Sequence, residues 1–482
     1  MGFAMGKSTA PDPVSDEASR VDLTTFAHKA LRVSFMGDPG SQSSTVRIYW
    51  TAFIGLLFDY YDLYLFVYLE KVLAAHFALA PAASNTLQFV GLAGVGLGAL
   101  GFGWLADRFG RGRIMLAVFG VYVLGIAGLS MAWSYASVLG FRLLASLALG
   151  AEWGISHTYL AERVDRATRY RFAALLQFAI LGGLLAALAR NYLLPAWGWR
   201  GLFAASIVPV VVLSFVRWRV LMTDTGYRIP DTGKANPPAK IGGDESLAEE
   251  DVGSALGRDS SVASDLPTEL AARVEGPRSN AEGPGLSPAA CDLRPSPFGS
   301  AGLRALRENA RAFAVCFGIA SLTIASGTIN VFYAKDLPQS VIYTVFFWFN
   351  VAPGMLLGAW VVRRRGVGRA LALYAVALVA LSGWAWTSAW PQRTLAFALV
   401  LPLLNGIPFG LMGAFFNEVF GKYRTMLSGA AYNLGRMLAG FSPALITALG
   451  LHQGGSYFLF TAGLGAGVLA LSIAAARLTR RF

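Results

Sequence analysis

Long apolar stretches recur along most of the chain, and they restrict its fold more than any other feature. Each meets the roughly 20 residues that a helix needs to cross the hydrocarbon layer of a membrane. Hydrophobic side chains make up 55% of the 482 residues and charged ones 14%, whereas soluble domains carry about 25% charged residues. We therefore predict an all-α membrane protein. Twelve transmembrane helices are expected, near residues 46–68, 83–105, 112–132, 136–161, 171–194, 199–221, 310–334, 338–362, 368–388, 393–418, 425–450 and 455–478.

A polar segment separates the sixth stretch from the seventh. Residues 222–309 are rich in Pro, Ser, Gly, Asp and Glu and contain few aromatic residues, a composition that cannot build a packed core. We predict a cytoplasmic disordered linker here, which acts as a spacer or carries a regulatory function. It divides the chain into a cytoplasmic tail (1–45), an N-terminal six-helix bundle (46–221) and a C-terminal six-helix bundle (310–482).

Basic residues are concentrated in alternate loops. The second loop contains Arg108, Arg111 and Arg113, whereas the first and fifth loops carry only Lys71 and Arg200. Because short basic loops remain in the cytoplasm, we expect a multi-pass protein of the inner (plasma) membrane with both termini cytoplasmic. This asymmetry accounts for much of the formal charge of +12. The expected partner is therefore the lipid bilayer and not a nucleic acid.

The second loop also has a distinctive spacing, with Gly103, Asp107, Arg108, Gly110 and Arg111. Glycines permit a tight turn, an aspartate can cap a helix start, and arginines bind carboxylates or lipid phosphates. An ordinary basic loop would explain the arginines but not the spacing of Asp and Gly. The segment resembles the signature loop of the major facilitator superfamily of transporters.

This resemblance implies a partner for the loop. In such transporters a loop arginine meets a glutamate that ends the fourth helix, here Glu162, and together with Asp107 they form a cytoplasmic latch that holds the outward-open state. The equivalent loop of the second half has Val362 where the aspartate would fall. We therefore expect the second latch to be weak.

Four further segments resemble the sialate, aromatic-acid and metabolite proton symporters of that superfamily. They are residues 58–63, 142–154, 197–203, and 432–436 with Pro443. Ala151 stands where the symporters have a glycine, and the Pro-Glu-Ser-Pro-Arg motif of sugar transporters is missing after the sixth stretch. The resemblance thus favours an organic acid over a sugar as cargo.

Ionisable residues inside the apolar stretches are candidates for function, because a charge at membrane depth costs on the order of 3 kcal/mol. Asp59 and Asp62 are three residues apart and share one helical face. The resemblance to proton-coupled transporters pairs Asp62 with Arg142, so that protonation of Asp62 would release Arg142; the alternative is a static ion pair. Glu152 and His157 would either continue a proton path or form a buried, hydrogen-bonded pair.

Arg436 lies about eleven residues into the eleventh stretch, too deep to reach a membrane surface easily. A fixed cation there requires an anion. The anion would be a substrate carboxylate, with Tyr432 and Asn433 adding hydrogen bonds, or a partner within the protein such as Glu152 or Glu418.

These residues together predict a proton-coupled symporter that carries a small organic anion, a carboxylate, by alternating access. Arg190, near the periplasmic end of the fifth helix, would help to attract the anion. The alternatives are a proton-antiport exporter of drugs or metabolites and a transport-inactive membrane sensor. The sequence shows no phosphate-binding loop, metal-ligand spacing or nucleophile elbow, so we expect no enzyme activity, no cofactor and no metal. We expect a monomer.

Overall fold

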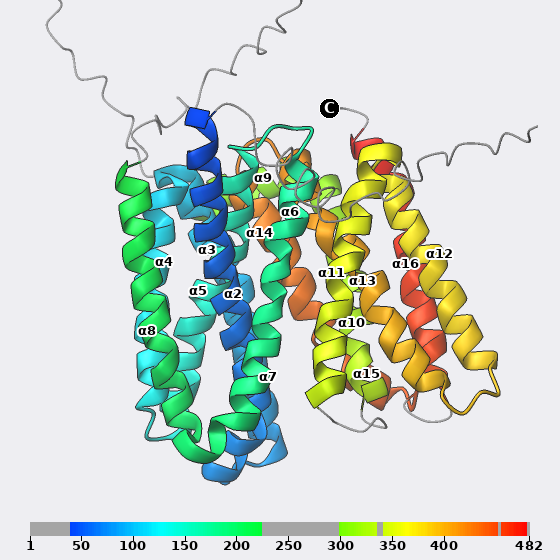
Figure 1. Ribbon diagram of the computed structural model, residues 1–482, viewed down its shortest axis with the longest axis horizontal. Helices are drawn as coiled ribbons and strands as arrows, with labels where there is room; N and C mark the ends of the chain where they lie inside the picture. The colour runs from blue at the N-terminus through cyan, green and yellow to red at the C-terminus, as the bar shows by residue number, and fades with distance from the viewer. Residues whose placement is uncertain (1–38, 224–297, 335–340, 452–454, 480–482) are drawn as a thin grey trace, which may run out of the picture. The chain divides into compact units, whose positions relative to one another are not determined.

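The computed structural model describes residues 39–223, 298–334, 341–451 and 455–479, and every regular element in these ranges is a helix. Figure 1 shows the helices coloured in chain order. The first half contains α2 (Pro39–His76), α3 (Pro81–Phe109), α4 (Arg111–Ser130), α5 (Tyr135–Ala161), α6 (Arg169–Gln177), the 3₁₀ segment η1 (Phe178–Leu181), α7 (Gly182–Tyr192) and α8 (Leu194–Thr223).

The second half continues with eight helices. They are α9 (Phe298–Glu308), α10 (Ala310–Ala334), α11 (Val341–Arg365), α12 (Val367–Thr387), α13 (Arg393–Val419), α14 (Arg424–Ala439), α15 (Ser442–Ala448) and α16 (Ser456–Thr479). Among the described residues, ten helical spans are long and apolar enough to cross a membrane. The two other predicted spans fall on α11 and on the pair α14 and α15. The prediction of an all-α, twelve-helix membrane fold is confirmed.

Two element boundaries differ from the prediction. Helix α2 begins at Pro39, several residues before the predicted end of the tail, and α9 (Phe298–Glu308) occupies the last part of the predicted linker. Helix α9 forms because its apolar side chains recur at helical spacing, and Ala305 is 2% exposed. The remainder of the tail (1–38) and of the linker (224–297) lies outside the described residues.

The eleventh predicted span is broken between α14 and α15. Gly440 and Phe441 separate the two helices, and Pro443 occupies the first turn of α15. Proline has no backbone N–H and its ring clashes with the preceding turn, so an uninterrupted helix cannot pass through this position. The break leaves Arg436 in the last turn of α14.

Apolar side chains face outward while charged ones are buried. Leu124, Val208 and Ile473 are 64%, 67% and 59% exposed, whereas Arg142 and Arg217 are 4% and 0% exposed. This arrangement is the reverse of that in a soluble protein. It is stable only where the outer surface contacts lipid instead of water.

The helices pack in two groups that meet along a few helices. In the first half α3 and α4 pack on α5 and α2 packs on α7; in the second half α11 packs on α13 and α12 on α16. Contacts between the halves run from α3 and α5 to α14, and from α6 to α11 and α13. Helix α14 therefore carries Tyr432, Asn433 and Arg436 along the surface between the halves.

Candidate functional site

The predicted latch residues are in contact at the end of the helices that the arginine pattern assigns to the cytoplasm. Arg111 places Nη2 3.1 Å from Oδ1 of Asp107 and 2.9 Å from Oε1 of Glu162. Gly110 turns the chain between α3 and α4 with φ of 95°, in the left-handed region that favours glycine. Arg108 is exposed, with its guanidinium carbon 5.4 Å from the centroid of the Trp104 ring. Arg111, not Arg108, is thus the arginine between the two acids.

Asp107 also joins the two halves of the protein. Its carboxylate accepts hydrogen bonds from the backbone N–H groups of Thr425, at 3.2 Å, and Met426, at 2.9 Å. These are unpaired donors in the first turn of α14, where the helix dipole also attracts an anion. Gly103 permits the approach, because a Cβ atom there would lie 2.8 Å from the Cα of Met426. We call Asp107, Arg111, Glu162 and the first turn of α14 the latch.

Burial shifts the pKa values of the latch groups toward their uncharged forms. Loss of solvent around Glu162 raises its pKa, although Arg111 and Arg424 act in the opposite direction. Burial likewise lowers the pKa of the Arg424 guanidinium. Burial raises the pKa of Asp107 as well, against the effects of Arg111 and the α14 backbone. The attraction between the latch groups therefore does not fully offset their desolvation.

A second set of contacts crosses between the halves close to the latch. The Glu418 carboxylate on α13 accepts a hydrogen bond from the Tyr170 hydroxyl on α6 and lies 3.7 Å from Nε of Arg166. Thr158 on α5 donates to Oδ1 of Asn417 at 2.7 Å. No local motif identifies these pairs, because the partners are about 250 residues apart in the chain.

We expect Asp107→Asn to loosen the start of α14. The substitution removes the charge that faces the helix dipole, an interaction that contributes up to about 2 kcal/mol when partly buried, so the closed latch should become roughly tenfold or more less favoured. The measurement is the rate at which N-ethylmaleimide modifies a cysteine placed at Ser428, which is fully buried, with Cys291 and Cys316 replaced by alanine. Asp165→Asn, at an exposed loop position, is the matched control. Equal rates in Asp107→Asn and the control would show that Asp107 does not hold α14.

The predicted coupling residues of α2 and α5 are buried in the first half. Asp62 and Arg142 are each 4% exposed, and the Arg142 guanidinium carbon lies 3.8 Å from the centroid of the Phe66 ring. Oδ1 of Asp62, Oδ2 of Asp59 and Nε of Arg142 are buried without a hydrogen-bond partner in the described part of the chain. None of the ion pairs between the described residues joins Asp62 to Arg142. The structure thus brings the acids and the arginine into one buried region but does not pair them.

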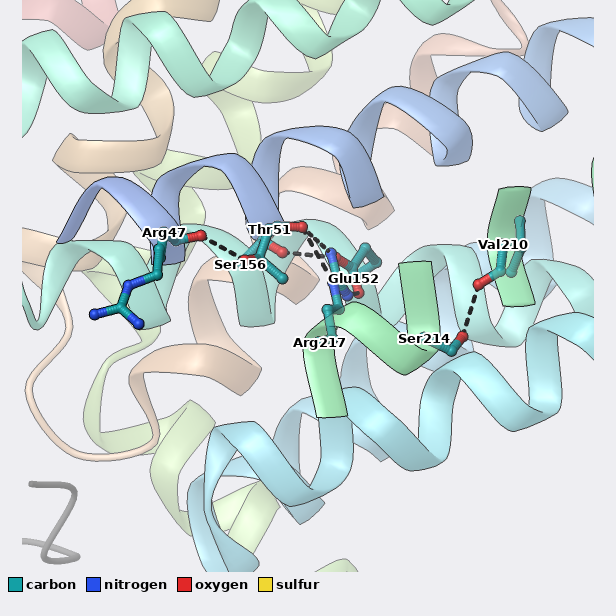
Figure 2. Close-up of polar contacts among 7 residues, drawn as sticks. All are labelled: Arg47, Thr51, Glu152, Ser156, Val210, Ser214 and Arg217. Carbon is teal, nitrogen blue, oxygen red and sulfur yellow. Dashed lines mark hydrogen bonds and ion pairs between the residues drawn. The ribbon is translucent and has the colours of Figure 1, made fainter. Parts of the chain in front are cut away.

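Glu152 forms a buried ion pair that the sequence analysis did not predict. Its two carboxylate oxygens accept hydrogen bonds from Nη1 and Nη2 of Arg217, at 3.1 and 2.6 Å, and its Oε1 also accepts one from Ser156 at 2.6 Å. Arg217 donates further from Nε and Nη2 to the carbonyl oxygen of Thr51. Figure 2 shows these residues converging from α2, α5 and α8. The geometry favours the second interpretation of Glu152, a buried hydrogen-bonded pair.

A glycine on α2 makes room for Arg217. A Cβ atom at Gly55 would lie 1.6 Å from Nη2 of Arg217, so any other residue there would displace the guanidinium. The ring of Phe119 also lies against the group, with its centroid 4.2 Å from the guanidinium carbon, a favourable position for a desolvated cation. Arg217 sits near the end of a predicted span, where it resembled the other arginines that flank the membrane.

Arg436 forms no ion pair with any of the described residues, although its charge acts on Asp59 over a longer distance. Its guanidinium carbon lies 5.8 Å from the centroid of the Tyr60 ring, and the side chain is half-buried. The two partners considered from the sequence are engaged elsewhere, because Glu152 is bound to Arg217 and Glu418 to Tyr170. A cation at this depth without a close ion pair is available to an anionic ligand.

The two neighbours of Arg436 on α14 have different surroundings. The Tyr432 hydroxyl lies 3.2 Å from that of Tyr60, and its ring stacks on Trp153 with centroids 3.8 Å apart. The Asn433 amide donates to the carbonyl oxygens of Gly150 and Gly429, at 2.9 and 3.1 Å. Tyr432 therefore faces the region of Arg436 and Tyr60, whereas the Asn433 amide nitrogen holds α14 against α5.

Arg190 is not close to Arg436, Tyr432 and Tyr60. It is exposed near the end of α7, where Nη1 donates to Oδ1 of the adjacent Asn191 at 2.9 Å. The structure thus brings Asp59, Asp62 and Arg142 together and places Tyr432 near Arg436. The charge of Arg436 also acts on Asp59 and Arg142, whereas Arg190 lies apart from these residues.

The fold and the buried charges define a polytopic α-helical membrane protein, and Arg436, on a helix between its two halves, forms no ion pair with the described residues. The profile of the Major Facilitator Superfamily matches residues 52–444. The chain belongs to this superfamily.

Individual relatives match over shorter regions. A niacin transporter of Acinetobacter baylyi is 32% identical over 163 residues, which are 34% of this chain and 37% of that protein. A cis,cis-muconate transport protein of the same species is 35% identical over 164 residues, 33% of this chain and 39% of that protein. The matched regions therefore span well under half of these relatives.

A solved structure resembles the fold over most of its length. It is that of the proton:xylose symporter XylE bound to 6-bromo-6-deoxy-D-glucose, with a TM-score of 0.59 at 16% identity, and it covers 89% of this chain and 95% of that one. At this identity the likeness concerns the fold alone.

Proposed function

We propose that the protein is a secondary transporter that carries a small organic anion, a carboxylate, in symport with protons by alternating access. The observation that carries this proposal is Arg436, a half-buried cation on a membrane helix that forms no ion pair with the described residues. A guanidinium grips a carboxylate through two parallel hydrogen bonds. The names of the relatives support an organic acid as cargo, because niacin and cis,cis-muconate are both carboxylates.

The proposed site lies between the two halves. Tyr60 and Tyr64 come from α2, Tyr432 and Arg436 come from α14, and Trp348 of α11 meets Tyr64 with ring centroids 4.7 Å apart. A ligand held by residues of both halves can move with them when they rock, which is the behaviour expected of transporters built from two bundles.

The proposed proton site is the pair Asp59 and Asp62. Both lie on α2, as does Tyr60, which contacts the anion site. Asp62 is buried without an ion pair in the described residues, so a proton that binds there would remove a charge from an apolar environment. Arg142, in the same region, would then stabilise the ionised form at another stage of transport. The coupling partner is thus proposed to be Asp62, with Arg142 as its cation.

We further propose that the latch end faces the cytoplasm, that both termini are cytoplasmic, and that the protein acts as a monomer in the plasma membrane. The loop arginines support this orientation. In this orientation the contacts of Asp107 with α14 and of Glu418 with Tyr170 would close the cytoplasmic side of the proposed site.

Uptake into proteoliposomes tests this function. With an inside-alkaline pH gradient, we expect accumulation of labelled niacin or cis,cis-muconate above equilibrium, and loss of accumulation when a protonophore collapses the gradient. The methyl esters should not compete, because an ester offers no anion to Arg436. If the esters compete as well as the free acids, an anionic cargo is contradicted. Uptake that is unchanged by the protonophore would contradict proton coupling.

A further inference from the structure

A chain of hydrogen bonds connects the interior of the first half to Tyr432. Nε1 of Trp153 donates to Oε1 of Gln177 at 3.2 Å, Nε2 of Gln177 donates to the Tyr60 hydroxyl at 2.6 Å, and the hydroxyls of Tyr60 and Tyr432 are 3.2 Å apart. The four side chains are between 1% and 4% exposed. They come from α5, α6, α2 and α14, so the chain crosses from the first half to the second.

Trp153 fixes the direction of this chain. An indole N–H can only donate, so the atom of Gln177 that faces it must be the oxygen. His157 lies 3.0 Å from the same oxygen and must therefore also donate, through Nε2–H. The amide nitrogen of Gln177 is left to face Tyr60. The orientation of Gln177 thus follows from chemistry, without reference to how its two similar atoms are assigned.

With Gln177 in this orientation, one hydroxyl hydrogen of the Tyr60 and Tyr432 pair is left over. Because Gln177 donates to Tyr60, the two hydroxyls hold two hydrogens but need only one for the bond between them. Where Tyr432 donates to the second lone pair of Tyr60, the spare hydrogen is on Tyr60. Where Tyr60 donates to Tyr432, the spare hydrogen is on Tyr432 and has no acceptor in the described part of the chain, so an anion bound beside Tyr432 favours this second arrangement. Arg436 is one helical turn further along α14. A hydroxyl donor and a guanidinium are thereby presented on the same side of the helix.

We propose that Trp153 and Gln177 are positioning residues: they orient the Tyr60 and Tyr432 hydroxyls so that Tyr432 donates a hydrogen bond to the anionic group bound by Arg436. This inference rests on the proposed function, since it assigns a second donor to the same anion. The two groups together offer only donors, so they favour a carboxylate, which only accepts, over a carboxamide of the same shape.

The direction would reverse if Gln177 turned over. Its oxygen would then accept from Tyr60, Tyr60 would accept from Tyr432, and no hydroxyl hydrogen would remain for the ligand. His157 could receive a hydrogen bond from the turned amide as its other neutral tautomer. The Trp153 N–H is the group that prevents this rearrangement, because it cannot accept.

The test uses Trp153→Phe, which retains an aromatic ring for stacking on Tyr432 but removes the N–H. We expect the dissociation constant of tritiated niacin, measured on the full-length protein in nanodiscs, to rise about tenfold, the effect of a lost hydrogen bond to a charged group. Binding of nicotinamide, the uncharged analogue, should change less than twofold. Tyr432→Phe should weaken niacin binding by a similar factor.

The double variant separates positioning from general damage. If Trp153 acts through Tyr432, then Trp153→Phe with Tyr432→Phe should bind niacin as Tyr432→Phe alone does, because the second substitution has nothing left to remove. Additive losses, or equal weakening for niacin and nicotinamide, would overturn the proposal. Trp384→Phe, at a 42% exposed position, is the matched control for a tryptophan substitution.

A second route exists if Trp153→Phe yields too little folded protein. In Gln177→Glu the carboxylate has no hydrogen to donate, so Tyr60 would donate to it. The hydroxyl hydrogen that would otherwise remain for the ligand is then used within the protein. Its negative charge repels an anion whether or not Tyr432 is present, so only the part of the effect that disappears with Tyr432→Phe supports the proposal. If the effect of Gln177→Glu is the same with and without Tyr432→Phe, the proposal is overturned.

The experiments distinguish failure of the proposed function from failure of the positioning role of Trp153 and Gln177. If Arg436→Ala abolishes niacin binding while Trp153→Phe and Tyr432→Phe bind as the parent does, the anion site stands and the positioning role is overturned. If the parent binds neither niacin nor cis,cis-muconate, both are overturned.

Discussion

Uptake of the organic anion should be lost in Arg436→Ala and retained with a weaker affinity in Arg436→Lys. Alanine removes the only cation that we place against the cargo, and a bidentate carboxylate pair with several charge-assisted hydrogen bonds supports a fall in kcat/KM of about 100-fold or more. Lysine keeps the charge but loses the planar fork, so its KM should rise several-fold or more. Initial rates of uptake, with the amount of protein at the cell surface measured in parallel, provide the comparison.

Arg304→Ala is a matched control for the loss of an arginine. Its side chain is 81% exposed on α9, so we expect normal uptake. If Arg436→Ala transports at the rate of the parent at equal surface amounts, Arg436 only supports the packing of α14, and the organic-anion proposal loses its main physical support.

Asp62→Asn should abolish accumulation driven by a proton gradient while exchange of labelled for unlabelled substrate continues. Asparagine resembles the protonated acid in shape and charge but has no proton to release, so the transporter would cycle only in its substrate-loaded form. The loss of net accumulation should be nearly complete, and exchange should remain within a few-fold of the parent. Proteoliposomes preloaded with substrate measure both quantities on the same preparation.

Asp59→Asn belongs in the same experiment, because both acids are on one face of α2 and each has a buried oxygen without a partner in the described residues. Accumulation that is normal in Asp62→Asn and lost in Asp59→Asn would move the coupling site by one turn. Glu152 is a weaker candidate than either, since both of its oxygens are bound by Arg217.

The helices and the latch were predictable from the sequence because their signals are local. A membrane span is a continuous run of apolar residues, and the Asp and Gly spacing between Gly103 and Arg111 is read within a single loop. The capping of α14 by Asp107 involves residues more than 300 positions apart. The sequence predicted that Asp107 could cap a helix, but only the packing of α3 against α14 identifies the helix that it caps.

The buried charges could not be paired from the sequence, because the pairing depends on which helix faces which. Arg217 lies 65 positions from Glu152, near the end of an apolar stretch where a basic residue usually reaches the membrane surface. Glu152 was consequently considered as a partner for Arg436 and as part of a proton path. Once Arg217 is placed against Glu152, neither role has a free carboxylate oxygen to support it.

The position of the Glu152 and Arg217 pair has a consequence for the speed of the proposed transport. All three helices that the pair joins belong to one half of the protein, and breaking a buried pair costs about 3–5 kcal/mol. The bonds that cross between the halves include neutral ones, such as Thr158 to Asn417 and Tyr60 to Tyr432, each of which contributes about 0.5–1.5 kcal/mol. In the proposed cycle the Glu152 and Arg217 pair therefore need not break. The activation barrier for turnover would come from the bonds that cross between the halves, which are these neutral ones and the charged ones of Asp107 and Glu418.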